Sequence, residues 1–158
     1  MRTMDPEAAP KTGFDEFYRR RWPDAARWAT ALTGRPAVGQ ELAQEAFLSV
    51  RARYDSLANP VGYLRRTVVN LSRAWYRSSA REEARMAAVA KPDVVAPQSS
   101  ELLDALAALP FHQRATLVLR FWADWTDADI ATVLECRPAT VRSHARRGLA
   151  ALRQELEP

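Results

Sequence analysis

Apolar residues recur along the 158-residue chain at intervals of three and four positions, and glycine is scarce, with five in all. Such intervals are typical of amphipathic helices, because a half-buried strand would alternate at every second position. The clearest case is a helix expected from about Val38 to Arg53, where a 4-3-4 spacing indicates a buried stripe. The stripe consists of Ala43, Phe47, Val50 and Tyr54. The pattern predicts an all-α protein.

Two more helices are expected around this one. The first runs from about Phe14 to Thr33, where Pro23 would kink or split it and Gly34 would end it. The third begins with Asn59 as its N-cap and Pro60 at its first position, a favourable start for a helix. Its apolar positions step 3-4-3-4 and are Val61, Leu64, Val68, Leu71 and Trp75. We expect the three helices to share one core.

The third helix also carries a polar row on its other side. The row steps 4-3-4-4 and consists of Arg66, Asn70, Arg73, Arg77 and Arg81, with no acidic residue from 65 to 81. The spacing places this row on the outside of the helix, where it faces a partner. Seen alone, such a row is as often a solvated helix face.

The second half of the chain begins after a break in the pattern. Residues 87–100, AAVAKPDVVAPQSS, contain two prolines and no helical period, so they are expected to form a flexible linker. The unit from 101 to 158 then contains a helix that stops at Pro110 and another from about His112 to Trp122. Between the two basic stretches of the chain, from 101 to 136, acidic residues outnumber basic ones: Glu101, Asp104, Asp124, Asp127, Asp129 and Glu135 against Arg114 and Arg120.

The end of the chain has the spacing of a helix-turn-helix motif. Thr126 and Asp129 form a capping pair at the start of a short helix, residues 135–137 make the turn, and Pro138 opens the last helix. Spacing assigns Val141, Ala145, Leu149 and Leu152 to the core. Its free side carries side chains suited to a DNA groove, namely Ala139, Thr140, Arg142, Ser143, Arg146 and Arg147.

Composition narrows the class of protein. The formal net charge of +4 and the pI near 9.7 favour a polyanionic partner. The mean hydropathy is −0.34, and the chain lacks the run of about 18 apolar residues that a membrane span requires. Residues 1–13 are expected to be a disordered tail. They contain no apolar stretch typical of a secretory signal, so the expected compartment is the cytoplasm.

The sequence contains no signature of catalysis or metal binding. Cys136 is the only cysteine, so no internal disulfide forms, and with His112 and His144 it does not supply zinc-ligand spacing. A phosphate-binding glycine loop, paired acids and an activated nucleophile are all missing. We therefore expect no metal, no cofactor and no enzymatic activity. Cys136 is interpreted as a small turn residue and His144 as solvent-exposed.

Four segments occur in a recognisable order, with the linker between the second and the third. They are ELAQEAFLSV (41–50), NPVGYLRRTVVN (59–70), ALPFHQRATLVLRFW (108–122) and IATVLECRPATVRSHARRGLAALR (130–153). Together they resemble the extracytoplasmic-function (ECF) sigma factors, the group 4 members of the sigma-70 family, and most of all its sigma-E-like actinobacterial subgroup. Two positions depart from the family: Glu41, where Asp is usual, and Arg137 with Pro138, where Ser and a small residue are common.

The resemblance implies a subunit that binds core RNA polymerase and promoter DNA to initiate transcription. Residues 14–86 would form the sigma-2 domain, residues 101–158 the sigma-4 domain, and residues 87–100 their linker. The clamp helices of the largest polymerase subunit would dock on Glu41, Gln44, Glu45 and Leu48. The linker would also permit a compact inhibited form held by an anti-sigma factor.

Two sets of residues would contact the promoter if the resemblance holds. The minus-ten element, where the non-template strand is opened, would meet Asn59, Tyr63, Arg66, Asn70, Arg73, Tyr76 and Arg77. There the arginines would neutralise backbone phosphates and Tyr63 and Tyr76 would stack on unpaired bases, whereas Trp75 is assigned to the core. The minus-thirty-five element would meet Arg137, Ala139, Thr140, Arg142, Ser143, Arg146 and Arg147. In this second set Arg142 and Arg146 are the expected base readers, and the others position the helix.

Two alternatives remain open from the residues alone. A stand-alone helix-turn-helix regulator would dimerise to read two half-sites, which leaves the first three helices without a defined role. An all-helical adaptor would use the same basic faces to bind acidic proteins. Only a sigma factor is expected to bind core polymerase in a stoichiometric complex.

Overall fold

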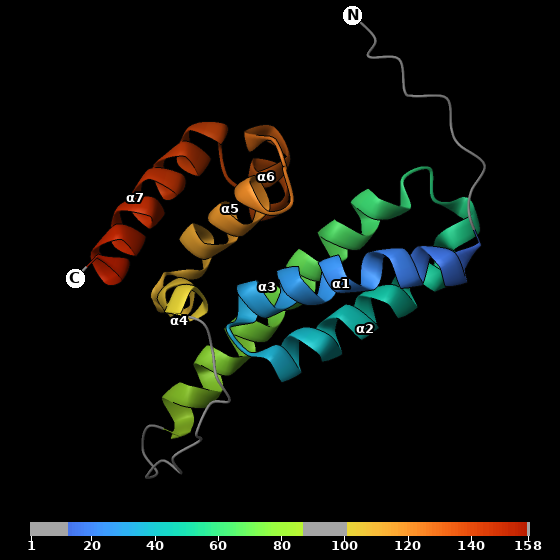
Figure 1. Ribbon diagram of the computed structural model, residues 1–158, viewed down its shortest axis with the longest axis horizontal. Helices are drawn as coiled ribbons and strands as arrows, with labels where there is room; N and C mark the ends of the chain where they lie inside the picture. The colour runs from blue at the N-terminus through green and yellow to red at the C-terminus, as the bar shows by residue number, and fades with distance from the viewer. Residues whose placement is uncertain (1–12, 87–100, 158) are drawn as a thin grey trace, which may run out of the picture.

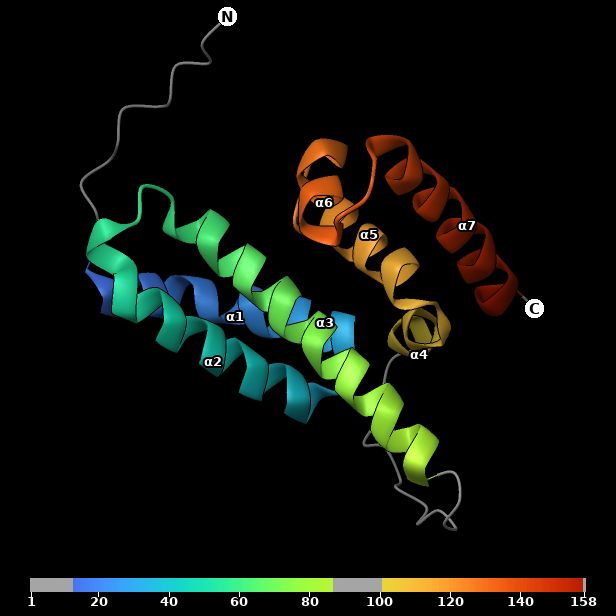
Figure 2. The same cartoon turned by 180° about the vertical axis from the view of Figure 1, so that it is seen from behind.

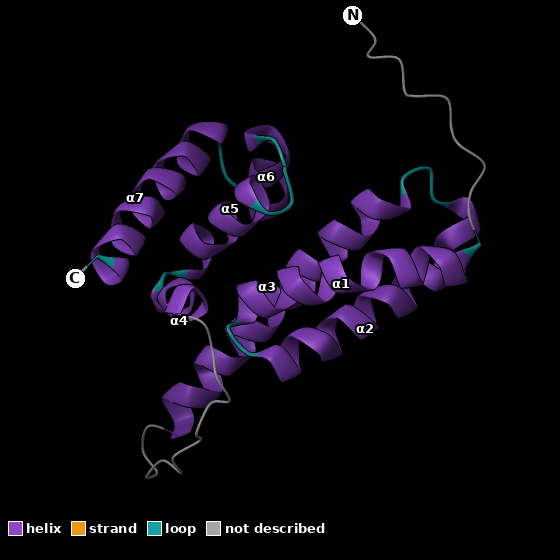
Figure 3. Cartoon of the chain, viewed as in Figure 1, coloured by secondary structure: helices purple, strands orange, loops and turns teal. Residues whose placement is uncertain are grey.

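The computed structural model describes residues 13–86 and 101–157, and there the chain forms seven α-helices, one short 3-10 turn and no strand (Figures 1 and 3). The elements are α1 (Phe14–Thr33), α2 (Pro36–Arg53), η1 (Tyr54–Ser56), α3 (Pro60–Met86), α4 (Glu101–Ala108), α5 (Phe111–Phe121), α6 (Asp127–Leu134) and α7 (Pro138–Leu156). The all-α prediction is confirmed. The expected tail, up to residue 12, and the expected linker, 87–100, lie outside the described residues.

The first helix ends where its sequence indicates. Gly34 takes up a left-handed conformation with φ of 74°, and its N–H donates to the carbonyl oxygen of Thr30 at 2.8 Å. Pro23 lies inside α1, which continues through it, so the expected split does not occur. A proline removes only one backbone donor, and packing of both halves of α1 on the same neighbours holds the helix together.

Side-chain caps begin two other helices as predicted. The Asn59 side-chain oxygen accepts from the N–H of Gly62 at 3.0 Å at the start of α3. The Thr126 hydroxyl oxygen accepts from the N–H of Asp129 at 3.2 Å at the start of α6. Each bond satisfies one of the donors that a helix N-terminus leaves unpaired. These helix starts follow from short-range chemistry.

Helices α1, α2 and α3 lie along one another as the first group of helices (Figures 1 and 2). The 4-3-4 stripe of α2 is buried along its whole length, as predicted. On α3, Leu64 and Val68 are completely buried, and the other three predicted core positions are half-buried. Val69 and Ser72 are also buried, which spacing did not indicate. The reason is that α3 also contacts α5 and α6.

Helices α4 to α7 form a second group around α5 (Figure 1). Seven residues of α5 are buried: Phe111, Arg114, Ala115, Thr116, Leu117, Val118 and Leu119. A helix buried on all sides needs neighbours on all sides. Leu117 packs with Leu106, Leu109 and Ala145 inside the second group. The opposite side of α5 therefore needs a cover from elsewhere.

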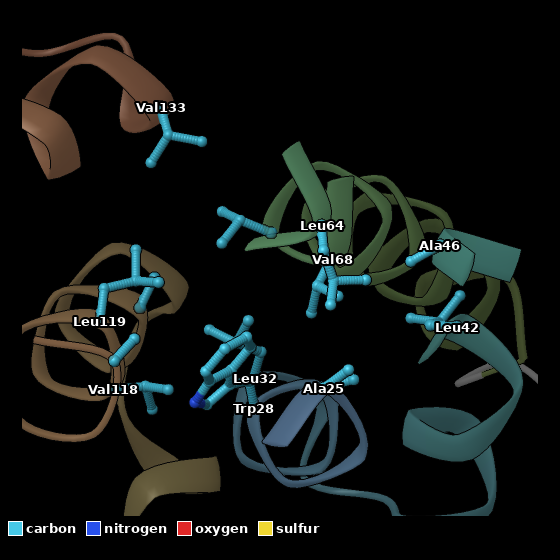
Figure 4. Packing of buried hydrophobic residues seen from close by; sticks show 14 of the residues in the cluster. Ala25, Trp28, Leu32, Leu42, Ala46, Leu64, Val68, Val118, Leu119 and Val133 are labelled. Carbon is cyan, nitrogen blue, oxygen red and sulfur yellow. The ribbon is translucent and has the colours of Figure 1, made fainter. Parts of the chain in front are cut away.

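That cover is the first group, because one apolar cluster runs through both. Val118 and Leu119 of α5 lie opposite Trp28 and Leu32 of α1 (Figure 4). Val133 of α6 belongs to the same cluster and is 7% exposed. The two groups are thus docked on each other, and α3 lies beside the second group.

Candidate nucleic-acid interface

The predicted helix-turn-helix motif is present at the end of the chain. α6 ends at Leu134, Glu135 turns the chain in a left-handed conformation with φ of 56°, and α7 starts at Pro138. Val141 and Ala145 hold α7 against the rest of the group. The predicted DNA-facing residues lie on its other side: Arg137, Ala139, Arg142, Arg146 and Arg147 are exposed, and Thr140 and Ser143 are half-buried. This face is free to meet a partner.

Four arginines surround a hollow of about 360 Å³ on this face. Arg142 and Arg146 are the expected base readers, and Arg120 and Arg153 join them from positions that were not predicted. Arg153 lies seven residues after Arg146 and so shares its helix face, which spacing could have revealed. Arg120 comes from α5, where it pairs with Asp127 at 2.9 Å. Arg120 reaches this hollow because α5 packs against α7, which spacing along the chain does not indicate.

The outer row of α3 is accessible at most of the predicted positions. Asn59, Arg66, Asn70 and Arg77 are exposed. The Tyr63 hydroxyl lies 3.0 Å from that of Ser49 on α2, so this half-buried ring is fixed against its own group. Arg81 has no described side chain. The exposed members form a basic strip suited to a phosphate backbone.

One member of the row, Arg73, and the stacking candidate Tyr76 are engaged elsewhere, so the expectation that this whole side of α3 faces a partner is wrong at these two positions. Arg73, with 15% of its side chain exposed, donates to the Glu135 carboxylate at 3.3 Å. Tyr76 is half-buried, its ring 5.4 Å from that of Phe111 and 5.1 Å from the Arg114 guanidinium. The cause is the docking of the second group onto α3. Their roles toward DNA stay predictions.

The face predicted to meet polymerase lies on α2. Glu41, Gln44 and Glu45 are exposed, and 58% of Leu48 is exposed. The opposite side of α2 is buried against α1 and α3. An exposed large apolar residue among carboxylates is suited to an interface with an apolar centre and a charged rim.

The two histidines lie together between α5 and α7. The rings of His112 and His144 are stacked with centroids 5.6 Å apart, and both residues are half-buried, so the expected exposure of His144 is wrong. Burial lowers the pKa of both imidazoles. The charge of Arg73 lowers the pKa of His112 further, and that of Arg147 lowers the pKa of His144. The folded protein therefore favours two neutral rings.

Protein stability should accordingly decline in mild acid. Each folded-state pKa lies below its unfolded value of about 6.5, so the unfolded chain binds more protons as the pH falls through that value. We expect the free energy of unfolding, measured by urea denaturation, to be lower at about pH 5.5 than at about pH 7.5. His112 and His144 are the only histidines. The variant His112→Gln/His144→Gln should lose most of this difference; an undiminished difference would show that other groups cause it.

The described residues contain no cluster of side chains that could hold a metal ion. Cys136 is half-buried in the turn before α7, and burial raises the pKa of its thiol. Within the same residues, no helix is long and apolar enough to cross a membrane. The exposed residues described above give a candidate interface of three parts: the arginine-bearing faces of α3 and α7, and the face of α2 that combines carboxylates with Leu48.

Comparison with known proteins gives the family. The family described as "Sigma-70, region 4" matches residues 99–152. The RNA polymerase sigma-E factor of Streptomyces avermitilis is 33% identical over 154 residues, covering 91% of this chain and 85% of that protein. The sigma-E factor of Streptomyces coelicolor is 30% identical over 151 residues, covering 90% and 85%.

Solved structures share the fold. The sigma factor RpoE of Bartonella quintana, in complex with the anti-sigma factor NepR, superposes with a TM-score of 0.75 at 20% identity, covering 91% of this chain and 96% of that one. CnrH, in complex with the cytosolic domain of CnrY, gives 0.63 at 20% identity, covering 91% and 87%. Identity and coverage along the Streptomyces relatives show that the chain belongs to the sigma-70 family of RNA polymerase sigma factors, as an ECF member similar to the sigma-E factors.

Proposed function

We propose that this sigma factor divides promoter-specific initiation among three surfaces. α2 would hold core RNA polymerase, α7 would read the minus-thirty-five element, and α3 would contact the minus-ten element while its strands are opened. The domains would be residues 14–86 and 101–158, joined by residues 87–100. The exposed arginine face of α7, presented by a helix-turn-helix, is the observation that carries the proposal.

The exposed face of α7 combines small side chains, which allow the backbone close to DNA, with long arginine side chains that extend to the bases. Ala139 and Thr140 are small residues in its first turn and would let the backbone enter a major groove. Arg142 and Arg146 follow one helical turn apart, where each guanidinium could grip a guanine edge with two hydrogen bonds. Arg137, Ser143 and Arg147 would position the helix on phosphates. Arg120 and Arg153 would add charge at the edge of the same hollow.

The surface of α3 would act on a separated strand. Arg66, Asn70 and Arg77 are exposed along one side and would follow the phosphates of the non-template strand. Tyr63 and Tyr76 would supply rings on which unpaired bases stack, a contact that tolerates many sequences. No bond is made or broken by the chain in this role, so we propose that it is not an enzyme and acts in the cytoplasm, where polymerase works.

The proposed polymerase-binding face of α2 can be tested by removing two of its side chains. The variant Glu45→Ala/Leu48→Ala removes a charge and an exposed apolar side chain without touching the core. We expect its affinity for core polymerase, measured by surface plasmon resonance, to fall about tenfold or more, the effect typical of an interface centre. Arg19→Ala, an exposed change on α1, is the matched control and should bind normally. Equal binding by both variants would place the docking face elsewhere.

Run-off transcription with purified core polymerase on a genomic DNA library tests the function as a whole. Transcripts from a restricted set of promoters, absent without the protein, are expected. Tight promoter binding by the free protein, with no need for polymerase, would instead indicate a stand-alone regulator. RpoE of Bartonella quintana was solved in complex with the anti-sigma factor NepR, and we propose that an anti-sigma factor also binds this chain.

A further inference from the structure

A hollow of about 230 Å³ lies where the end of α1 meets α4 (Figures 1 and 2). We propose that this junction hollow binds a small planar anion of the class of aromatic carboxylates. The proposal goes beyond promoter recognition and does not rest on it. Both groups of helices line the hollow, the first with Thr33, Gly34, Arg35, Trp75, Tyr76 and Ser79, and the second with Ala107 and Arg114.

The charge around the junction hollow is positive. Arg35 and Arg114 both line it, and no acidic side chain is among the described residues that do so. Arg114 is 1% exposed, and its four acceptors are carbonyl oxygens, which carry only partial negative charge. α2 begins at Pro36, directly after Arg35, so the positive end of its dipole adds to the charge of that side chain. An anion is therefore attracted to this hollow.

Two aromatic side chains give the junction hollow flat walls. Trp75 and Tyr76 are half-buried on α3 and lie next to each other in the sequence. The Arg35 guanidinium is 5.8 Å from the centre of the Trp75 ring, and the Arg114 guanidinium is 5.1 Å from that of Tyr76. Rings and guanidinium planes are the surfaces on which a planar π-system packs most favourably. The hollow therefore suits a flat ligand.

Hydrogen-bond donors in the hollow match a carboxylate. The N–H donors of an arginine lie in the plane of its guanidinium, so the face of Arg35 can contact Trp75 while its edge points toward two carboxylate oxygens. The hydroxyl of Ser79, which is half-buried on α3, is a further donor. Arg35 thus holds the carboxylate, and Ser79 supports it.

The volume limits the size of the ligand. Sites for drug-sized ligands have about 300 to 1,000 Å³ and are common between domains. The junction hollow is smaller than this range, so a single ring with one carboxylate suits it better than a nucleotide does. Ala107 is an exposed residue of its lining, so the hollow is open to a ligand from solvent.

Benzoate is the probe for this class of ligand, and benzamide, which has nearly the same shape without the charge, is its control. We expect the full-length protein to bind benzoate with a Kd of about 0.1–1 mM, a range suited to so small a ligand. Benzamide should bind about tenfold more weakly, because it forms no charge-assisted bond with Arg35. Titrations followed by NMR should move the signals of the Gly34 amide and the Trp75 indole N–H, which belong to the lining.

Filling the hollow should abolish binding. Ala107→Leu places a larger side chain in the lining and leaves the backbone carbonyl that accepts from Arg114 in place. We expect this variant to lose the benzoate-induced shifts of Gly34 and Trp75. Ala108→Leu is the matched control, since this exposed neighbour on α4 does not line the hollow, and it should bind benzoate like wild type.

Removing the charge tests the site without filling it. Arg35→Gln should weaken benzoate binding about tenfold and leave benzamide binding nearly unchanged, because only the carboxylate depends on the guanidinium. Arg19→Gln, an exposed change on α1, is the matched control and should alter neither affinity. Circular dichroism of each variant shows whether it is still folded.

Three results would overturn the proposal. The first is that neither the Gly34 nor the Trp75 signal moves at about 10 mM benzoate, roughly ten times the weakest expected Kd. The second is equal affinity for benzoate and benzamide, which would show that the site does not select an anion. The third is unchanged benzoate binding by both Ala107→Leu and Arg35→Gln, which would place the ligand elsewhere. Run-off transcription tests the proposed function separately, and neither outcome depends on the other.

Discussion

Replacing Arg114 by methionine should lower the free energy of unfolding by about 3 kcal/mol or more, because several buried carbonyl oxygens lose their donor at once. The residue is 1% exposed and donates to the carbonyl oxygens of Leu32, Leu106, Ala107 and Leu109 at 2.7 to 2.9 Å. These oxygens lie at or just past the C-terminal ends of α1 and α4, where carbonyls lack helical partners and the helix dipole is negative. Methionine would fill the volume but donate no bond.

The matched control is Arg120→Met, on the same helix. Arg120 pairs with Asp127 where a third of its side chain meets solvent, so its loss should cost about 1 kcal/mol at most. Both variants would be compared by urea denaturation followed by circular dichroism. Equal losses would mean that the four carbonyl bonds of Arg114 contribute no more than a surface ion pair.

Replacing Arg142 and Arg146 together by alanine should reduce run-off transcription from cognate promoters about 30-fold or more, since each bidentate contact with a base contributes about 1–3 kcal/mol of discrimination and about 1.4 kcal/mol is tenfold. Both side chains are exposed and line the arginine hollow of α7. Binding to core polymerase should be unchanged, because α2 lies on the other group. The loss should be similar at every promoter that carries the same minus-thirty-five sequence.

Gln154→Ala, an exposed change near the end of α7, is the control and should transcribe like wild type. Circular dichroism of the double variant shows whether it is still folded, and so whether a lower transcription rate is caused by lost DNA contacts or by unfolding. If transcription survives in a folded double variant, α7 does not read the promoter through these two arginines. If polymerase binding falls as well, the assignment of separate surfaces to α2 and α7 is wrong.

The helices and their limits could be predicted because their causes are local. The glycine at the end of α1, the asparagine at the start of α3 and the threonine at the start of α6 each act within four residues along the chain. The buried stripe of α2 likewise needs only the helical period. The exposed reading face of α7 follows from the same period, once Val141 and Ala145 are assigned to the core.

The burial and the bonding partners of individual polar side chains could not be predicted from local spacing. Arg114 resembles any helix arginine in the sequence, yet it is buried because carbonyls from two other helices converge on it. Arg73 and Arg77 belong to one row, but only Arg77 is exposed, since Glu135 approaches Arg73 from a turn 62 residues away. His144 is half-buried because His112 lies on the neighbouring helix.

By itself the sequence determined an all-helical chain, a helix-turn-helix with an arginine face and the resemblance to ECF sigma factors, because spacing and capping act over a few residues and motifs are read in order. Only the tertiary structure decided that the two groups dock through α5 and that part of the α3 row is covered. Docking depends on the shapes and charges of surfaces that are distant along the chain, and the helical period of either surface contains no information about the other.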